Sequence, residues 1–299
     1  DADTNHEVFN AGGVSYASYR VAAVMEELAE YEPDLFIVYT GQNEFLERRT
    51  YADFFDQSQA QLWLTGWLNK TRTYRVIDSL VPKKRPPKSD SNSIGLAAEV
   101  DERLNHTVGP SDYVRDEEWS DNVRKHFRFN VRRMISIAQS ANAKILFVVP
   151  ASNEKDCGPF KPDPEEDLFE RGRQAFEAGD YEVARSAFRS AIDRDICPLR
   201  APSDFARFIR ELPESDDVRV LDFESALRDV CQNEYGHDIL GKEYFLDHVH
   251  PTVEAHRQLS RWLIAEMQDA GWLADGSIAV EQLPPEAIAE VDQSVFDRI

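Results

Sequence analysis

Asp247 and His250 lie three residues apart in the segment DHVHPT, near the end of the chain. At this spacing a carboxylate can accept a hydrogen bond from an imidazole, which orients the ring and stabilises its cation while the ring acts as a general base. Taken alone, the pair also fits a surface cluster or a metal site that includes His248. The metal site is the weaker alternative, because side chains two residues apart on an extended segment point in opposite directions.

Two other segments carry groups that suit a developing negative charge. The segment GQNE contains Asn43, whose side-chain amide can donate a hydrogen bond to an oxyanion. The alternative for Asn43 is a simple turn cap. The segment NAGGVSYAS, close to the start of the sequence, combines two adjacent glycines with small hydroxylated residues. Its backbone N–H groups are candidates for the same oxyanion.

The segments around these polar groups predict strands that alternate with helices. A strand is expected over residues 6–9 and a second, buried on both faces, over 34–41, with a helix over 19–30 between them. A helix over 121–141, a strand in AKILFVVPASN, a strand and helix in DVRVLDFESAL and a helix over 251–271 follow. This alternation predicts an α/β fold with a mostly parallel sheet. The polar segments should meet where the parallel strands end.

Composition and charge limit the classes of function. The 299 residues are 42% hydrophobic, which is enough for a full core, and the net charge of −21 disfavours nucleic acids and anionic membranes as partners. Cys157, Cys197 and Cys231 show no CxxC spacing, so we expect ordinary, partly buried thiols. No apolar run approaches the roughly 18 residues of a transmembrane helix, and the first residues are acidic, unlike a signal peptide.

A first insertion is expected over 45–120, within a single domain that covers 1–299. This stretch is far longer than the roughly 2 to 6 residues of an ordinary α/β connection. It contains an apolar stripe with two tryptophans, followed by a basic, proline-rich run. We expect a helix packed on the domain and a solvated loop; a mobile lid or a membrane-surface helix is the alternative.

A second insertion is expected over 166–198, which resembles a single tetratricopeptide repeat. Gly172, Phe188 and their neighbours stand where the two helices of that repeat need small and aromatic residues. A single copy cannot bury a continuous core. The hairpin is therefore expected to dock on its own domain, with a surface for a protein partner as the alternative.

The three polar segments together resemble the SGNH (GDSL) hydrolase family, whose signature is four short blocks on a flavodoxin-like, three-layer α/β/α domain. NAGGVSYAS is similar to the second block, GQNE to the GxND of the third, and DHVHP to the DxxH of the fifth. The resemblance extends from Glu7 to about Gly271, apart from the two insertions. The third block ends here in Glu44, where the family has aspartate.

The resemblance implies a role for each of these residues. His250 is the general base, Asp247 orients it, and Asn43 donates to the oxyanion. The second oxyanion donor is usually the backbone N–H of a glycine, and Ser15 occupies that position here. Gly13, with its neighbour, can supply the turn that brings this N–H into place.

The family's nucleophilic serine belongs to a first block, on a strand before the second block, and the printed sequence begins after that point. The resemblance therefore implies a segment before Asp1 that supplies both the serine and the first strand of the sheet. A separate chain that supplies the segment, or an inactive domain, are the alternatives. Ser91, Ser93 and Ser111 lie in the first insertion, where a solvated linker is expected.

The implied function is a serine esterase or acyltransferase for small acyl esters, including O-acetyl groups on carbohydrates, without cofactor or metal. Asn153 and Arg200, close to predicted strand ends, are candidates for substrate contact; caps and surface positions are their alternatives. A catalytically inactive scaffold that binds protein partners through 166–198 is the alternative function. Many similar proteins act outside the cytoplasm, some behind an N-terminal anchor, which is the one membrane association that the resemblance implies.

Overall fold

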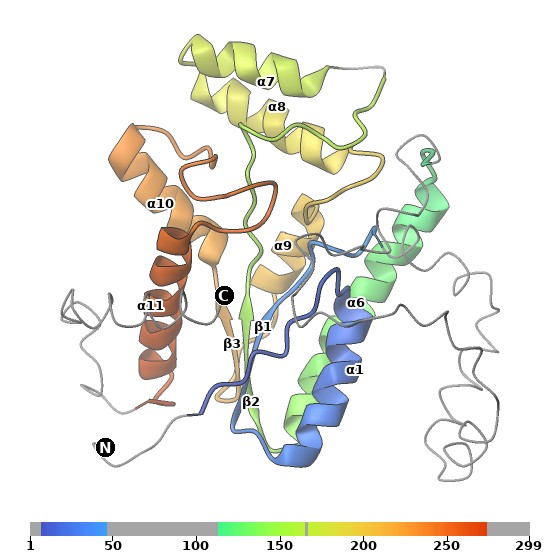
Figure 1. Ribbon diagram of the computed structural model, residues 1–299, viewed down its shortest axis with the longest axis vertical. Coiled ribbons are helices and arrows are strands. Elements are labelled where there is room, and N and C mark those ends of the chain that lie inside the picture. Colours follow the sequence, from blue (N-terminus) through green and yellow to red (C-terminus); the bar gives the residue numbers. More distant parts are fainter. Residues whose placement is uncertain (1–6, 47–112, 165–166, 274–299) are drawn as a thin grey trace, which may run out of the picture. The chain divides into compact units, whose positions relative to one another are not determined.

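A computed structural model describes residues 7–46, 113–164 and 167–273, which belong to one mixed α/β unit. Its sheet has three parallel strands in the order β1 (Leu35–Tyr39), β2 (Lys144–Val148) and β3 (Val218–Leu221). All three strands run in the same direction, so the loops after them lie at one edge of the sheet (Figure 1). Residues 47–112 of the first expected insertion lie outside the described ranges.

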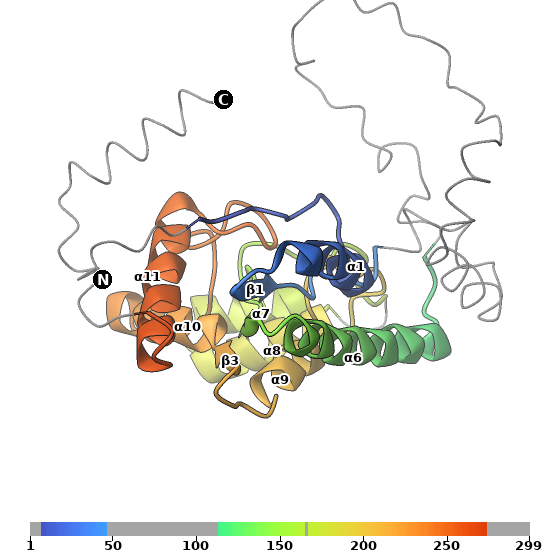
Figure 2. The same ribbon diagram turned by 90° about the horizontal axis from the view of Figure 1, so that it is seen from below.

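Helices pack on both faces of this sheet, as Figure 2 shows. Successive residues of β2 point to opposite faces, so Ile145 and Phe147 join one core cluster while Leu146 and Val148 join the other. The first cluster includes side chains of α1 (Ser18–Leu28), α6 (Glu117–Ser140) and α9 (Ser203–Arg210). The second includes side chains of α10 (Phe223–Tyr235) and α11 (Val253–Asp269).

Most of the elements expected from periodicity are confirmed. The helix expected over 19–30 is α1 followed by the short helix η1 (Ala29–Tyr31), and that expected over 121–141 is α6. Helix α9 was not expected; it has eight residues and follows Pro202, which gives little periodicity to read. Cys157 is partly buried and Cys197 and Cys231 are buried, all as free thiols. None of the described helices is long and apolar enough to cross a membrane.

Two expectations about strands are wrong. The residues Glu7, Val8 and Phe9 form no strand, and Val8 and Phe9 are 89% and 76% exposed. Strand β1 is not buried on both faces, because Ile37 is 46% exposed. Both departures have one physical cause: β1 is an edge of the described sheet, so neither it nor the segment before α1 has a strand beside it on that side.

The residues of the second insertion form a helical hairpin, α7 (Leu168–Glu177) and α8 (Tyr181–Asp193), at the top of Figure 1. The hairpin is attached to its own domain by ion pairs from α8, with Arg185 bound to Asp238 and Arg189 to Glu224. Ile239, in the loop after α10, packs into the apolar cluster of the hairpin.

Candidate active site

The Asp247–His250 pair has the geometry expected of an oriented general base. Asp247 Oδ2 lies 2.7 Å from His250 Nδ1, and Asp247 Oδ1 accepts hydrogen bonds of 2.9 Å from the backbone N–H groups of Val249 and His250. Burial acts to raise the pKa of Asp247, but these hydrogen bonds and the nearby imidazole outweigh it and hold the pKa below its ordinary value. The His250 side chain is 73% exposed, so its Nε2 side is open to a reacting partner.

The loop that carries the pair is closed by backbone hydrogen bonds. Leu246 N–H donates to the carbonyl of His250 at 2.8 Å, and Thr252 N–H donates to the carbonyl of Tyr244 at 2.9 Å. Thr252 then begins α11, because its hydroxyl accepts from the backbone N–H of Ala255. The loop therefore starts and ends at fixed points, which limits the positions that the His250 ring can take.

The turn before α1 places Ser15 in a left-handed backbone conformation. Ser15 has a φ of +57°, a left-handed value that is uncommon for residues other than glycine. Serine therefore occupies this backbone conformation at the position where the resemblance implies glycine. The carbonyl of Gly13 accepts from Tyr16 N–H at 3.3 Å, and a Cβ at Gly13 would overlap the Tyr16 ring. Gly13 thus lets the Tyr16 ring lie directly against the backbone of the turn.

Asn43 lies against the same turn. Its Nδ2 donates a hydrogen bond of 3.3 Å to the carbonyl oxygen of Tyr16, which follows Ser15. An amide carries two N–H groups, so this bond orients the side chain and leaves the second N–H for an acceptor such as an oxyanion. The structure thus brings together the two residues to which the resemblance gives oxyanion roles.

Glu44 connects this turn to the helix behind it. Its carboxylate accepts from the backbone N–H of Ser18 at 2.7 Å and from the Ser18 hydroxyl at 2.8 Å, and Asn130 on α6 donates to that hydroxyl at 3.2 Å. The N-cap of α1, Ala17, has no side chain that could cap the helix. A carboxylate from a distant loop therefore takes the place of the cap at the positive end of the helix dipole.

Gln42 ties three loops together at the same edge of the sheet. Its amide nitrogen donates to the carbonyl of Ala151, after β2, at 2.9 Å, and its amide oxygen accepts from Ala201 N–H, before α9, at 2.7 Å. The sequence alone gave no role to Gln42, and it did not show that Glu44 caps α1. The GQNE segment contained both, but only the fold reveals their partners.

Asn153 and Arg200, expected as substrate contacts, are each only 2% exposed and bind the protein itself. Asn153 N–H donates to the carbonyl of His248 at 2.9 Å. Arg200 Nη1 donates to the carbonyls of Asn153 and Cys157 at 2.7 and 2.8 Å. The two residues therefore hold the loop after β2 against the loop of the Asp247–His250 pair. Because both are buried, the structure gives no support to the expectation that they contact substrate directly.

The site thus consists of two groups at one edge of the sheet. One is the Asp247–His250 pair; the other is Asn43 with the Ser15 turn. No hydrogen bond joins the two groups within the described residues, and the contacts of Gln42 and Asn153 link the loops that carry them. In this part of the chain no three His, Cys, Asp or Glu side chains converge as metal ligands, His248 included.

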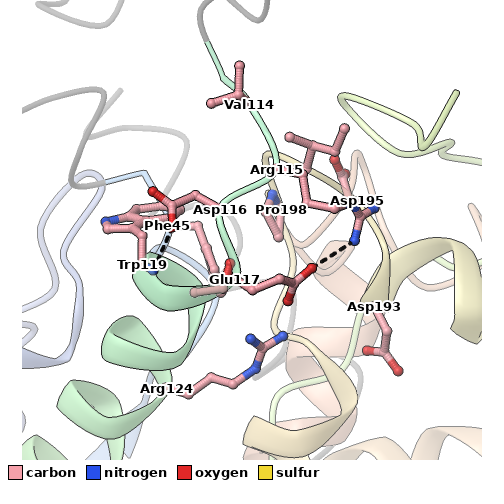
Figure 3. A pocket seen from close by; sticks show the side chains of 12 residues that line it. Phe45, Val114, Arg115, Asp116, Glu117, Trp119, Arg124, Asp193, Asp195 and Pro198 are labelled. Carbon is pink, nitrogen blue, oxygen red and sulfur yellow. Dashed lines mark hydrogen bonds and ion pairs between the residues drawn. The ribbon is translucent and has the colours of Figure 1, made fainter.

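A separate, small pocket lies between the start of α6 and the loop after α8 (Figure 3). Neither His250 nor Asn43 lines this pocket, although Phe45, which follows the GQNE segment, does. Its charged side chains are already engaged: Arg115 pairs with Glu117 at 3.3 Å, and Asp195 accepts three backbone N–H groups. The pocket therefore adds no group to the candidate chemistry.

Comparisons with known proteins add no relative to this description. No family model, no curated protein and no solved structure matches the chain.

Proposed function

We propose that the protein is a serine ester hydrolase or acyltransferase of the SGNH type, built on a flavodoxin-like α/β/α domain. One observation carries the proposal: Asp247 holds His250 Nδ1 at 2.7 Å while two backbone N–H groups hold the same carboxylate. The two backbone bonds fix the carboxylate in the turn, so the imidazole meets an acceptor that is already oriented. The left-handed turn at Ser15 and the oriented amide of Asn43 add support from the other side of the site.

In the proposed mechanism a serine Oγ attacks the carbonyl carbon of an acyl ester and transfers its proton to His250 Nε2. Asp247 stabilises the imidazolium, while the Asn43 amide and the Ser15 N–H donate to the oxyanion of the tetrahedral intermediate. The C–O bond to the alcohol then breaks, and His250 returns the proton to the leaving oxygen. Water, or an acceptor alcohol, attacks the acyl-serine by the same route and releases the acyl group.

The nucleophile in this proposal is a serine that precedes the Ser15 turn in the natural protein, on a strand beside β1. Two observations support an additional strand there. Ile37, in an apolar strand, is 46% exposed, and the apolar residues Val8 and Phe9 before the turn are largely exposed. A strand paired with β1 would cover its free edge and end beside the candidate oxyanion donors.

The test uses the complete natural protein and a fluorophosphonate probe, which reacts with activated serines. We expect one labelled serine, identified by peptide mass spectrometry, together with hydrolysis of p-nitrophenyl acetate and of an acetylated polysaccharide. His250→Ala should abolish labelling and hydrolysis. His256→Ala is the matched control, because His256 is an exposed histidine on α11 that bonds only within its helix turn.

The outcome of this test separates the enzyme from the scaffold. Labelling that is lost in His250→Ala and kept in His256→Ala supports the enzyme. A complete protein that neither labels nor hydrolyses esters contradicts it and leaves a binding module, whose partners would then be sought at the α7–α8 hairpin.

A further inference from the structure

Helix α6 concentrates positive charge in an otherwise acidic protein. The whole chain has 55 Asp and Glu against 34 Lys and Arg. Between Asn122 and Ser140, however, α6 contains five Lys and Arg residues and no acidic one. This segment therefore has the opposite charge to the protein as a whole.

Three of these basic residues share one side of the helix with a phenylalanine. At about 3.6 residues per turn, Lys125, Arg128, Phe129 and Arg132 project in the same direction, opposite the side that packs into the core. Lys125, Phe129 and Arg132 are exposed, with Phe129 at 61%. We refer to these four residues as the basic face. The core side consists of Phe127, Asn130, Val131, Met134, Ile137 and Ala138.

The acidic side chains near α6 pair mainly with arginines at the borders of the basic face. Asp204 on α9 lies 3.2 Å from Arg128 and 3.5 Å from Arg124, and Glu26 on α1 lies 2.8 Å from Arg133. Within the described residues, Lys125 and Arg132 have no acidic partner. Lys125 and Arg132 therefore place positive charge on both sides of Phe129, and the exposed Asp121, one turn before Lys125, marks the end of the basic face.

The arginines of the basic face are held in place by an aromatic ring. The guanidinium carbons of Arg128 and Arg132 lie 5.7 and 5.4 Å from the ring centre of Phe208 on α9. A cation above an aromatic face is attracted by its quadrupole. A partner would therefore meet guanidinium groups that are already ordered, which reduces the entropy lost on binding.

We propose that the basic face is a docking surface for a short acidic segment of a protein partner, with one apolar side chain of that segment against Phe129. Arginine and aromatic residues are enriched in protein interfaces, and lysine at their rim suits carboxylates. From Lys125 to Arg132 the face is about 10 Å long, which an extended peptide spans in roughly three to four residues. The partner's footprint is therefore small.

The limited length favours a peptide over a nucleic acid or a membrane. A duplex or a lipid surface extends well beyond α6, so its negative charge meets the acidic remainder of the protein. A peptide confined to the basic face is shielded from those acidic groups, because salt screens charges over about 8 Å at physiological ionic strength. Membrane-surface helices also need a broad apolar side, and the basic face offers Phe129 alone.

The test measures binding of a fluorescein-labelled peptide, four glutamates around one phenylalanine, to the complete protein by fluorescence anisotropy. We expect saturable binding at about 50 mM salt that weakens at about 0.3 M. The double variant Lys125→Glu, Arg132→Glu should weaken binding by about tenfold or more, and Phe129→Ala by a smaller factor. The matched control reverses two exposed arginines of α7, Arg171→Glu with Arg173→Glu, and should leave binding unchanged.

Three outcomes would overturn the proposal. The first is no binding at about 1 mM peptide. The second is an equal loss in the α7 control, which would mean general attraction to positive charge. The third is tighter, Lys125- and Arg132-dependent binding of a DNA duplex or of phosphatidylglycerol vesicles at the same salt. Circular dichroism of each variant verifies that it is folded, and none of these residues belongs to the candidate active site.

Discussion

The backbone N–H of Asn153 donates a 2.9 Å hydrogen bond to the carbonyl oxygen of His248, which lies between the two members of the Asp247–His250 pair in sequence. Arg200 binds the carbonyl of the same Asn153 from the other direction. The loop that carries the candidate base is thus held by residues about a hundred and about fifty positions away along the chain. Its geometry is a property of the fold rather than of the DHVHPT segment alone.

Replacing Arg200 tests this positioning. Arg200→Met removes the donors of two buried carbonyls, those of Asn153 and Cys157, and each unpaired carbonyl costs about 1 to 3 kcal/mol. We expect lower stability in urea unfolding and faster hydrogen exchange at the Asn153 amide, because the loop no longer stays against His248. Arg200→Lys keeps a positive charge with one donor nitrogen on a side chain of different shape, and should show an intermediate effect. Wild-type exchange in Arg200→Met would mean that the loop is held by other contacts.

Replacing Asp247 tests the orientation of the base. In Asp247→Asn the amide oxygen can still accept the backbone N–H groups of Val249 and His250, but the side chain presents N–H to His250 Nδ1 and favours the wrong tautomer. We expect kcat of the complete enzyme on p-nitrophenyl acetate to fall by about 10⁴-fold, the size seen when a Ser-His-Asp triad loses its aspartate. The unfolding midpoint should hardly change. Retention of full activity would exclude Asp247 as the orienting residue.

Replacing Glu44 tests the cap of α1. Glu44→Ala leaves the buried N–H and hydroxyl of Ser18 without their acceptor, and hydrogen bonds to a charged group contribute about 1.5 to 3 kcal/mol each. We expect a loss of roughly 2 to 4 kcal/mol in urea unfolding. Ser18→Ala keeps the backbone bond and should cost about half as much. Equal stability of Glu44→Ala and the wild type would contradict the cap.

The sequence predicted the fold wherever periodicity was strong. The long amphipathic helices α6 and α11 and the apolar strand β2 were correctly located. Each buries many apolar residues in the core, which gives a clear pattern in the sequence. The strand expected at 6–9 failed because a four-residue segment with two apolar residues, Val8 and Phe9, makes a strand only when another strand pairs with it. That partner is a long-range feature, which a local pattern does not contain.

For the candidate site, residue types were predictable and partners were not. The three-residue spacing of Asp247 and His250 was sufficient to predict their contact, since both lie in one closed loop. Arg200 was selected for its position near a strand end, but its role depends on a contact with Asn153, 47 residues earlier. Contacts of this kind arise from topology, so sequence spacing identified the residue but not the carbonyl groups that it binds.

Acid should weaken the attachment of the hairpin through His237. Burial, together with the charge of Lys155, lowers the pKa of His237 below its ordinary value of 6.5, and its Nδ1 accepts the backbone N–H of Ile239 at 3.3 Å. The unfolded chain therefore takes up this proton at a higher pH than the folded chain, so stability falls as the pH drops through 6.5 towards the folded pKa.

The measurement is the urea midpoint between about pH 7.5 and 5.5. His237→Gln retains an acceptor without titrating and should reduce the slope in this window. Part of the slope should persist, because burial and the charge of Arg200 also lower the pKa of His248. A slope identical to that of the wild type would show that His237 does not contribute.

A single methyl group at Gly172 should destabilise the hairpin. Alanine normally stabilises a helix relative to glycine by about 1 kcal/mol. A Cβ at Gly172 of α7, however, would lie 2.6 Å from Phe188 Cδ1, and Phe188 is 1% exposed between the hairpin and Ile239, so its ring has no room to move. Overpacking of this kind costs about 1 to 3 kcal/mol, which outweighs the gain in helix propensity.

We therefore expect Gly172→Ala to lower the free energy of unfolding in urea by up to roughly 2 kcal/mol, the cost of overpacking less the gain in helix propensity. Arg171→Ala, an exposed substitution in the same helix, is the control and should be nearly neutral. Phe188→Leu in the Gly172→Ala background should recover part of the loss, because the smaller side chain makes room for the methyl group, and a double-mutant cycle isolates that coupling. If Gly172→Ala raised the stability instead, helix propensity would be the larger effect, and the two helices would not be packed as closely as Gly172 and Phe188 imply.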